Sequence, residues 1–146
     1  MLPLSAEIDT QQMFLCQTQG NLFELAWRKG YRMSEFVEKF MNSQIAARLD
    51  SPYSRTQWDG EERLLHDIAE ECSLIPDAKP DDVNSEALFW AGYLYRYWHY
   101  YTGESSKEMF AKTGFRRMMY TYPGYHTLAC EKAIQKLLEP AGEVAA

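Results

Sequence analysis

The chain has 146 residues, of which 46% are hydrophobic and 25% are charged, so it can form a folded core and is not an intrinsically disordered chain. Its formal charge of −6 argues against nucleic acid and acidic membrane surfaces as partners. No stretch approaches the roughly 20 consecutive apolar residues that a membrane-spanning helix needs.

The first half of the sequence predicts three helices separated by turn residues. The first covers residues 9–29 and ends at Gly30, which suits the left-handed position after a helix. The second is expected to begin at Ser34 and to continue to Leu49, because hydrophobic residues recur at helical spacing throughout. The third covers residues 61–72.

A linker and a series of helices make up the second half. Two prolines and three acids between residues 76 and 82 predict the linker. Ser105 and Glu108 form a capping box that opens a helix, which Gly114 interrupts. The remaining expected elements are a short helix at residues 115–120, a turn at Tyr122-Pro-Gly-Tyr and a last helix at residues 128–138.

The most distinctive segment of the chain holds eight aromatic residues within thirteen positions. They are Phe89, Trp90, Tyr93, Tyr95, Tyr97, Trp98, Tyr100 and Tyr101. On a helix capped by Ser85, seven of these rings fall on one broad face, and Ala91, Gly92, Tyr95, Arg96 and His99 fall on the other. We expect the ring face to be the centre of the core. The alternative is a stacking platform for bases or a ligand, which would need more basic residues than Arg96 alone.

These elements predict an all-α protein, folded as a compact bundle of about six to seven helices in a single domain of residues 1–146. The halves also resemble each other: residues 13–73 align with residues 86–138, at an offset of 73 through residue 46 and, with four residues of the first half removed, with residue 62 matching residue 131. The acidic, proline-containing linker at residues 76–83 lies between them. A duplication would place two related helical units about a pseudo-twofold axis. Amphipathic helix pairs of separate origin would share some of the same identities.

The second half contains a recognisable series of short motifs. They are Tyr95-Arg, Tyr101-Thr-Gly, Ser-Lys-Glu-Met-Phe-Ala-Lys-Thr-Gly, Tyr122, His126-Thr and Ala-Ile-Gln-Lys-Leu. With these motifs, residues 87–138 resemble a family of short uncharacterised all-helical bacterial proteins that are often encoded beside predicted ADP-ribosyltransferase-like toxins. Family members are typically half as long and have more acids near the last helix, where this chain has Lys132 and Lys136. The resemblance implies an accessory or antitoxin-like role and no known chemistry.

One group of residues has the composition of a metal site. Glu62, His66 and Glu70 follow one another at four-residue intervals on the predicted third helix, so they project from the same side. Two carboxylates and an imidazole can ligate a divalent metal, although a functional site normally takes a further ligand from another helix. The alternative, which we favour, is a solvated face with ion pairs between successive turns, and we expect no cofactor.

Two further groups are candidates for binding a protein partner. Tyr95 and His99 lie one turn apart on the side of the aromatic helix away from the other rings, and they form either a partner-binding strip or a contact with a second helix layer. Arg116 and Arg117 precede a turn that contains Tyr125 and His126. Arginines and aromatic rings on a loop can bind a partner, or they can be ordinary surface residues around a structural turn.

The leading hypothesis is a non-enzymatic protein-interaction module of a bacterial cytoplasmic protein, whose partner is another protein such as a toxin, or a second copy of the chain. A cytoplasmic location is expected because the N-terminal sequence does not resemble a signal peptide, and because the three cysteines are odd in number and widely spaced. The alternative is a small helical enzyme or ligand-binding domain with a His/Tyr site. No recognisable nucleophile spacing or glycine-rich phosphate loop supports an enzyme.

Overall fold

The computed structural model describes residues 8–77 and 79–139, and these contain eight α-helices, one 3-10 helix and no strand. The elements in chain order are α1 (Thr10–Arg28), α2 (Met33–Met41), α3 (Gln44–Asp50), η2 (Arg55–Trp58), α4 (Glu61–Cys72), α5 (Ser85–Thr102), α6 (Ser106–Lys112), α7 (Phe115–Tyr125) and α8 (Cys130–Leu137). The all-α prediction is confirmed. The number of α-helices among the described residues is larger than the expected six to seven, because the segment expected as one helix at residues 34–49 is two helices.

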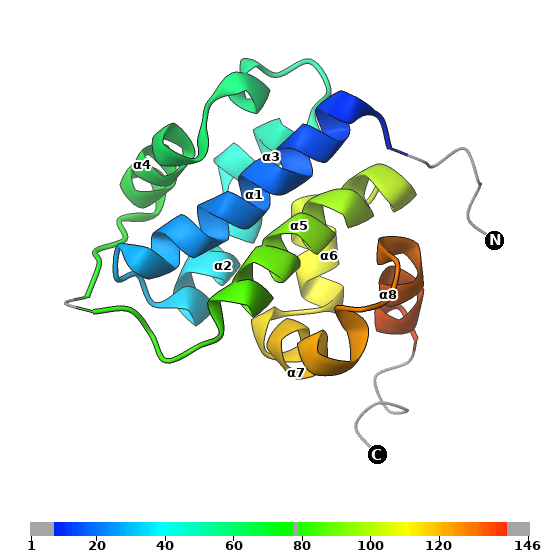
Figure 1. Cartoon of the computed structure of the whole chain (residues 1–146). Coiled ribbons are helices and arrows are strands. Elements are labelled where there is room, and N and C mark those ends of the chain that lie inside the picture. Colours follow the sequence, from blue (N-terminus) through cyan, green and yellow to red (C-terminus); the bar gives the residue numbers. More distant parts are fainter. Residues whose placement is uncertain (1–7, 78, 140–146) are drawn as a thin grey trace.

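The fold is organised around α1 and α5, which run antiparallel and side by side (Figure 1). Their backbones come unusually close because two glycines lie at the crossing. A Cβ atom at Gly92 would lie 2.5 Å from the carbonyl oxygen of Gln19, and a Cβ atom at Gly20 would lie 2.7 Å from the ring of Phe89. The Gln19 side-chain amide donates to the carbonyl oxygen of Gly92 at 2.9 Å, which ties the two helices at this point.

The other helices surround this pair. α2, α3 and α6 lie behind it, α4 packs beside α1, and α7 and α8 pack beside α5 (Figure 1). Edge-on ring contacts link α1 to α2: Phe23 meets Phe36 at 6.1 Å and Phe40 at 5.8 Å between ring centroids. Tyr95 approaches Phe23 at 6.5 Å, so the aromatic helix joins the same core. Among the described helices, none has both the length and the apolar character needed to cross a bilayer.

The aromatic helix is buried on more sides than the sequence predicts. Trp98 is fully buried and Tyr97 is 8% exposed, as expected for the ring face, but four other rings of that face are only half-buried: Phe89, Trp90, Tyr93 and Tyr100. The side opposite the rings is also buried, with Ala91 and Arg96 at 0% and 1% exposed. This side packs against a second helix layer, the alternative given for Tyr95 and His99, because α1 lies directly against it and makes α5 the central helix.

The expected helix at residues 34–49 is two helices. Ser43 ends α2 and caps α3, since its hydroxyl accepts a hydrogen bond from the amide of Ala46 at 3.0 Å. The carboxylate of Glu71 on α4 also accepts from the amides of Gln44 (2.7 Å) and Ile45 (3.3 Å). These acceptors satisfy the amides at the start of α3, which stabilises the break.

The turn expected at Tyr122-Pro-Gly-Tyr is the last turn of α7. Pro123 lies near the end of an eleven-residue helix, where its fixed φ is compatible with the helix and only one backbone hydrogen bond is lost. The amide of His126 still donates to the carbonyl oxygen of Tyr122 at 3.0 Å. At α5 the N-cap is Asn84 rather than Ser85, while the capping box of Ser105 and Glu108 is confirmed.

The linker between the two halves is fixed to the end of α1 and the start of α2. Asp81 accepts from the amide of Met33 at 2.7 Å and from the guanidinium of Arg32 at 2.6 Å. Its carbonyl oxygen accepts from the indole of Trp27 at 2.7 Å. Gly30, with φ of +93°, contributes its carbonyl oxygen to the amide of Asp77 at 2.7 Å. The linker therefore follows a defined path across the surface.

Candidate functional site

Tyr95 lies in the core rather than on a surface. Its ring is 0% exposed, and its hydroxyl donates to the carbonyl oxygen of Thr113 at 2.5 Å. Burial raises the pKa of this phenol well above its ordinary range. The expectation that Tyr95 contributes to an exposed partner-binding strip is therefore wrong, and the alternative of packing against a second layer describes its position.

His99 is held mainly by local contacts. Its Nδ1 lies 2.6 Å from the carbonyl oxygen of Glu104 and 3.8 Å from the carboxylate of Asp50, and its side chain is 14% exposed. The carboxylate of Glu104 accepts from the indole of Trp98 at 2.7 Å and pairs with Lys112. Burial alone would raise the pKa of Glu104, but these hydrogen bonds lower it below its ordinary value.

A buried polar network lies beneath His99, and sequence reasoning did not find it. The guanidinium of Arg96, only 1% exposed, donates to Gln19 at 2.9 Å and Asp50 at 2.8 Å. Asp50 also accepts from the amide and the hydroxyl of Ser106 at 2.8 and 2.9 Å. The network joins α1, α3, α5 and α6, so its role is structural. The sequence signal for this buried network was the single arginine, Arg96, within the aromatic helix.

The three cysteines are free thiols that take part in packing. Burial raises the pKa of Cys16 to about 12 and that of Cys130 to about 11, and it also raises the pKa of Cys72. Thiols with raised pKa values are poor nucleophiles at neutral pH.

The exposed side of α7 gathers arginine and aromatic side chains. Arg116 is exposed, and Tyr120, one turn further along the helix, is 75% exposed. The ring of Tyr122 stacks on His126 at 4.5 Å and meets Trp90 edge-on at 5.6 Å. We call the exposed pair Arg116 and Tyr120 the α7 surface; Tyr122 and His126 lie on another side of the helix, because Tyr122 is two positions, about 200°, from Tyr120. Arg116 and His126 were predicted from the sequence, whereas Tyr120 was missed, although its spacing of four residues from Arg116 is a helical signal.

The other two predicted residues of this region are less accessible. Tyr125 is half-buried and packs against the core. Arg117 is half-buried, and its guanidinium donates to the carbonyl oxygen of Lys136 on α8 at 3.4 Å. Both side chains therefore hold α7 against its neighbours.

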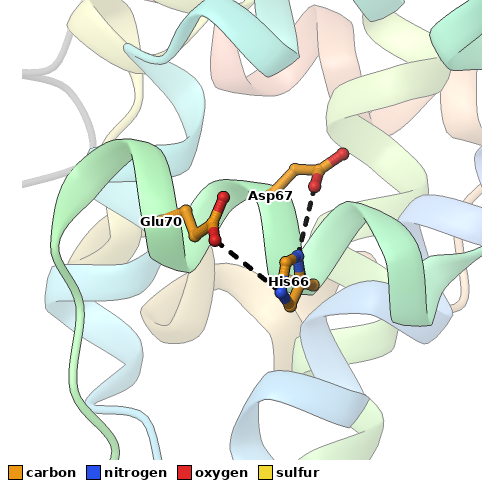
Figure 2. Close-up of side chains that lie close together, drawn as sticks. All are labelled: His66, Asp67 and Glu70. Atoms are coloured by element: carbon orange, nitrogen blue, oxygen red, sulfur yellow. Dashed lines mark hydrogen bonds and ion pairs between the residues drawn. The ribbon is translucent and has the colours of Figure 1, made fainter.

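A cluster of possible metal ligands lies on α4, but its members differ from the predicted set. Figure 2 shows His66 between Asp67 and Glu70, with Nδ1 at 3.3 Å from Asp67 and Nε2 at 3.9 Å from Glu70. The ligand atoms of these three residues lie within 4.8 Å of one another, and Glu62 is not among them. Asp67 also pairs with Arg63 at 3.1 Å. All three possible ligands come from one helix, so the arrangement matches the solvated face with ion pairs better than a metal site.

Glu62 and His66 instead line a surface cavity of about 350 Å³ between the end of α1 and α4. The full lining is Leu25, Lys29, Tyr31, Glu62, Leu65, His66 and Pro76. Lys29 and Tyr31 were not predicted as site residues. Neither His99 nor His126 lines this cavity.

The fold and its surfaces define an all-α protein with an aromatic and arginine-bearing face on α7. Comparison of the chain with known protein families, with curated proteins and with solved structures gives no match.

Proposed function

We propose that this protein is a non-enzymatic interaction module and that the α7 surface is where it contacts its partner. The observation that carries the proposal is the 75% exposure of the Tyr120 ring, one helical turn from the exposed Arg116 on α7. Tyrosine, tryptophan and arginine are the residue types that contribute most to binding free energy at protein interfaces. A rigid helix presents them at low conformational cost.

The positions of the histidines support a binding role over catalysis. His66 is on the exposed side of α4, His99 is held against the carbonyl oxygen of Glu104, and His126 caps the end of α7. A general base needs a substrate or nucleophile in a shared pocket. The alternative enzyme or ligand-binding domain would need Tyr95, His99 and His126 to share one site, whereas Tyr95 is in the core and His126 is on the surface.

We propose a toxin as the partner and occlusion as the mechanism, with the α7 surface covering the partner's working site in the cytoplasm. The resemblance of residues 87–138 to proteins encoded beside toxins supports this choice. Co-expression with a toxin-like reading frame adjacent to the gene tests it: growth should be restored by the native chain and less well by Tyr120→Ala. Equal growth arrest with and without the native chain would refute the antitoxin role.

Site-specific crosslinking tests the interaction surface itself. The photoreactive residue p-benzoyl-phenylalanine is placed at position 120 or, as the matched control, at position 53, because Tyr53 is 94% exposed and lies in the loop before η2. In native cells we expect a discrete crosslinked partner from position 120 and none from position 53. A crosslink to a second copy of the chain would identify a homodimer. Equal labelling from the two positions, or none from position 120, would contradict the proposal.

A second candidate function is ligand binding in the cavity between α1 and α4. Its volume of about 350 Å³ lies within the range of small-molecule sites, and Lys29, Glu62 and His66 surround an apolar floor of Leu25 and Leu65. A thermal-shift screen of small zwitterionic and anionic metabolites tests it. A stabilising compound should lose its effect in Leu65→Lys; no stabilising compound in the screen would remove this candidate.

We also propose that the two halves are duplicated units. The helices of the first half have counterparts in the same order in the second, α1 with α5, α2 with α6, α3 with α7, and α4 with α8. Gln19 and Gly92, which touch, are 73 positions apart, the same offset at which the sequences align. Equivalent positions meet only at a twofold axis. An experimental structure in which residues 10–72 and 85–137 superpose by a rotation far from about 180° would refute the duplication.

A further inference from the structure

The charge of the molecule is divided between two regions. Residues 115–137 contain four basic residues and one acid, a formal charge of +3, within a chain whose total is −6. Residues 33–72 contain nine acids and four bases, a formal charge of −5. The α7–α8 region is therefore positive within an acidic protein, and its field favours partners of opposite sign.

The positive charges of α7 and α8 are not neutralised within the described part of the chain. Arg116, Arg117, Lys132 and Lys136 form no ion pair with any described carboxylate. The one acid of this region, Glu131, accepts a hydrogen bond from the hydroxyl of Tyr97 on α5. The described carboxylate of this region is thus hydrogen-bonded to α5 and forms no ion pair with the arginines.

The arginines also occupy unfavourable positions on their own helix. Arg116 and Arg117 lie in the first turn of α7, where no acid is present and where Gly114 provides no capping side chain. The helix dipole is positive at this end, so cations there reduce helix stability. By contrast, α2, α4, α5 and α8 all have an acid in the first turn. A locally unfavourable choice without an internal compensating charge is typical of a functional surface.

From these observations we infer that the α7 surface binds an acidic protein segment, with carboxylates at Arg116 and an apolar or aromatic side chain against Tyr120. This inference rests on the proposed interaction function and specifies the chemistry of the partner. A protein partner is favoured over nucleic acid because the −5 charge of residues 33–72 repels a polyanion that extends beyond α7, whereas a short acidic segment meets only the positive region.

A titration of the full-length, ¹⁵N-labelled chain tests the inference. The probes are a synthetic peptide of glutamates and leucines, a lysine and leucine peptide of equal length, and a single-stranded oligonucleotide. We expect the acidic peptide to shift the amide signals of residues 114–126 and to lose affinity as salt is added. Arg116→Glu should weaken this binding by about tenfold, and Arg55→Glu, an exposed arginine on η2, should leave it unchanged.

The Arg116→Glu variant should fold normally, because glutamate in the first turn is favourable and Arg116 makes no described hydrogen bond or ion pair. Its melting temperature should equal or exceed that of the native chain. Three results would overturn the inference: no shift of α7 signals by the acidic peptide, equal effects of the two arginine variants, or tighter binding of the oligonucleotide or the lysine peptide at α7. If a partner is crosslinked at position 120 but its binding is insensitive to Arg116→Glu, the proposal of an acidic partner segment is refuted, whereas the proposal that the α7 surface is the interaction site is retained.

Discussion

The substitution Gly92→Ala tests the packing on which the fold depends. The added Cβ atom would lie 2.5 Å from the carbonyl oxygen of Gln19 and 3.0 Å from the Cα of Gly20. Both neighbours are backbone atoms of α1, so a rotamer change cannot relieve the contact. α1 and α5 must separate by roughly 1 Å to reach ordinary contact distances.

Three effects set the size of the change in the free energy of unfolding. Overpacking costs about 1–3 kcal/mol, and alanine returns about 1 kcal/mol because it is the better helix former. Separation of the helices also lengthens the hydrogen bonds from Gln19 to Gly92 and from Arg96 to Gln19, both 2.9 Å, at a cost of about 1–3 kcal/mol. The net expectation is a destabilisation of about 1–5 kcal/mol, centred at about 3 kcal/mol, or roughly 10 °C in melting temperature at the centre of that range.

Urea unfolding followed by far-UV circular dichroism measures this change, and Gly124→Ala is the matched control. Gly124 also lies within a helix, but a Cβ atom there meets nothing within 4 Å. The control should therefore gain about 0.5–1 kcal/mol from helix propensity alone. If Gly92→Ala were as stable as the native chain while Gly124→Ala showed its expected gain, the close approach of α1 and α5 would be incorrect.

Arg96→Ala should destabilise the fold by about 3–5 kcal/mol in the same assay, because it leaves the carboxylate of Asp50 without its buried partner; a loss below about 1 kcal/mol would show that the network is solvated. The pKa values of Cys16 and Cys130 are raised to about 12 and 11, so the folded state disfavours the thiolates. Their contribution to the free energy of unfolding is complete below the ordinary thiol pKa of about 8.5 and declines above it. The melting temperature should therefore fall as the pH rises from about 8.5 to 11, and a melting temperature that stays constant over this range would contradict the burial of the two thiols. The pKa of Glu104 is lowered in the folded state, so its carboxylate contributes to the free energy of unfolding above the ordinary glutamate pKa of about 4.3, and this contribution is lost as the pH falls below that value. In Glu104→Gln the free energy of unfolding should therefore depend less steeply on pH below about pH 4.3. The same pH dependence in the variant and the native chain would show that this carboxylate does not contribute.

Several elements could be predicted because their signals are local. The first helix, the helix at residues 61–72 and the aromatic helix have hydrophobic residues at helical spacing and recognisable ends, and the capping box of Ser105 and Glu108 needs only four consecutive residues. The break at Ser43 escaped prediction because it depends partly on Glu71, 27 positions from the amide of Gln44 that it caps. The helical conformation of Pro123 escaped prediction because proline and glycine together usually indicate a turn.

The residues of the candidate site also divide into those with a local sequence signal and those whose position depends on tertiary packing. Arg116 and His126 could be named from composition, but the burial of Tyr95 and the exposure of Tyr120 could not, since both depend on which helices pack against α5 and α7.

The sequence by itself determined that the chain is all-helical and rich in aromatic core residues, because helix periodicity and capping act over a few neighbouring residues. Only the tertiary structure decided that α1 lies against the glycine face of α5, that Arg96 is buried with Asp50, and that α7 carries its arginine and tyrosine outward. The physical reason is that burial and charge pairing are set by contacts between residues far apart in the chain, which the spacing within any one helix does not specify.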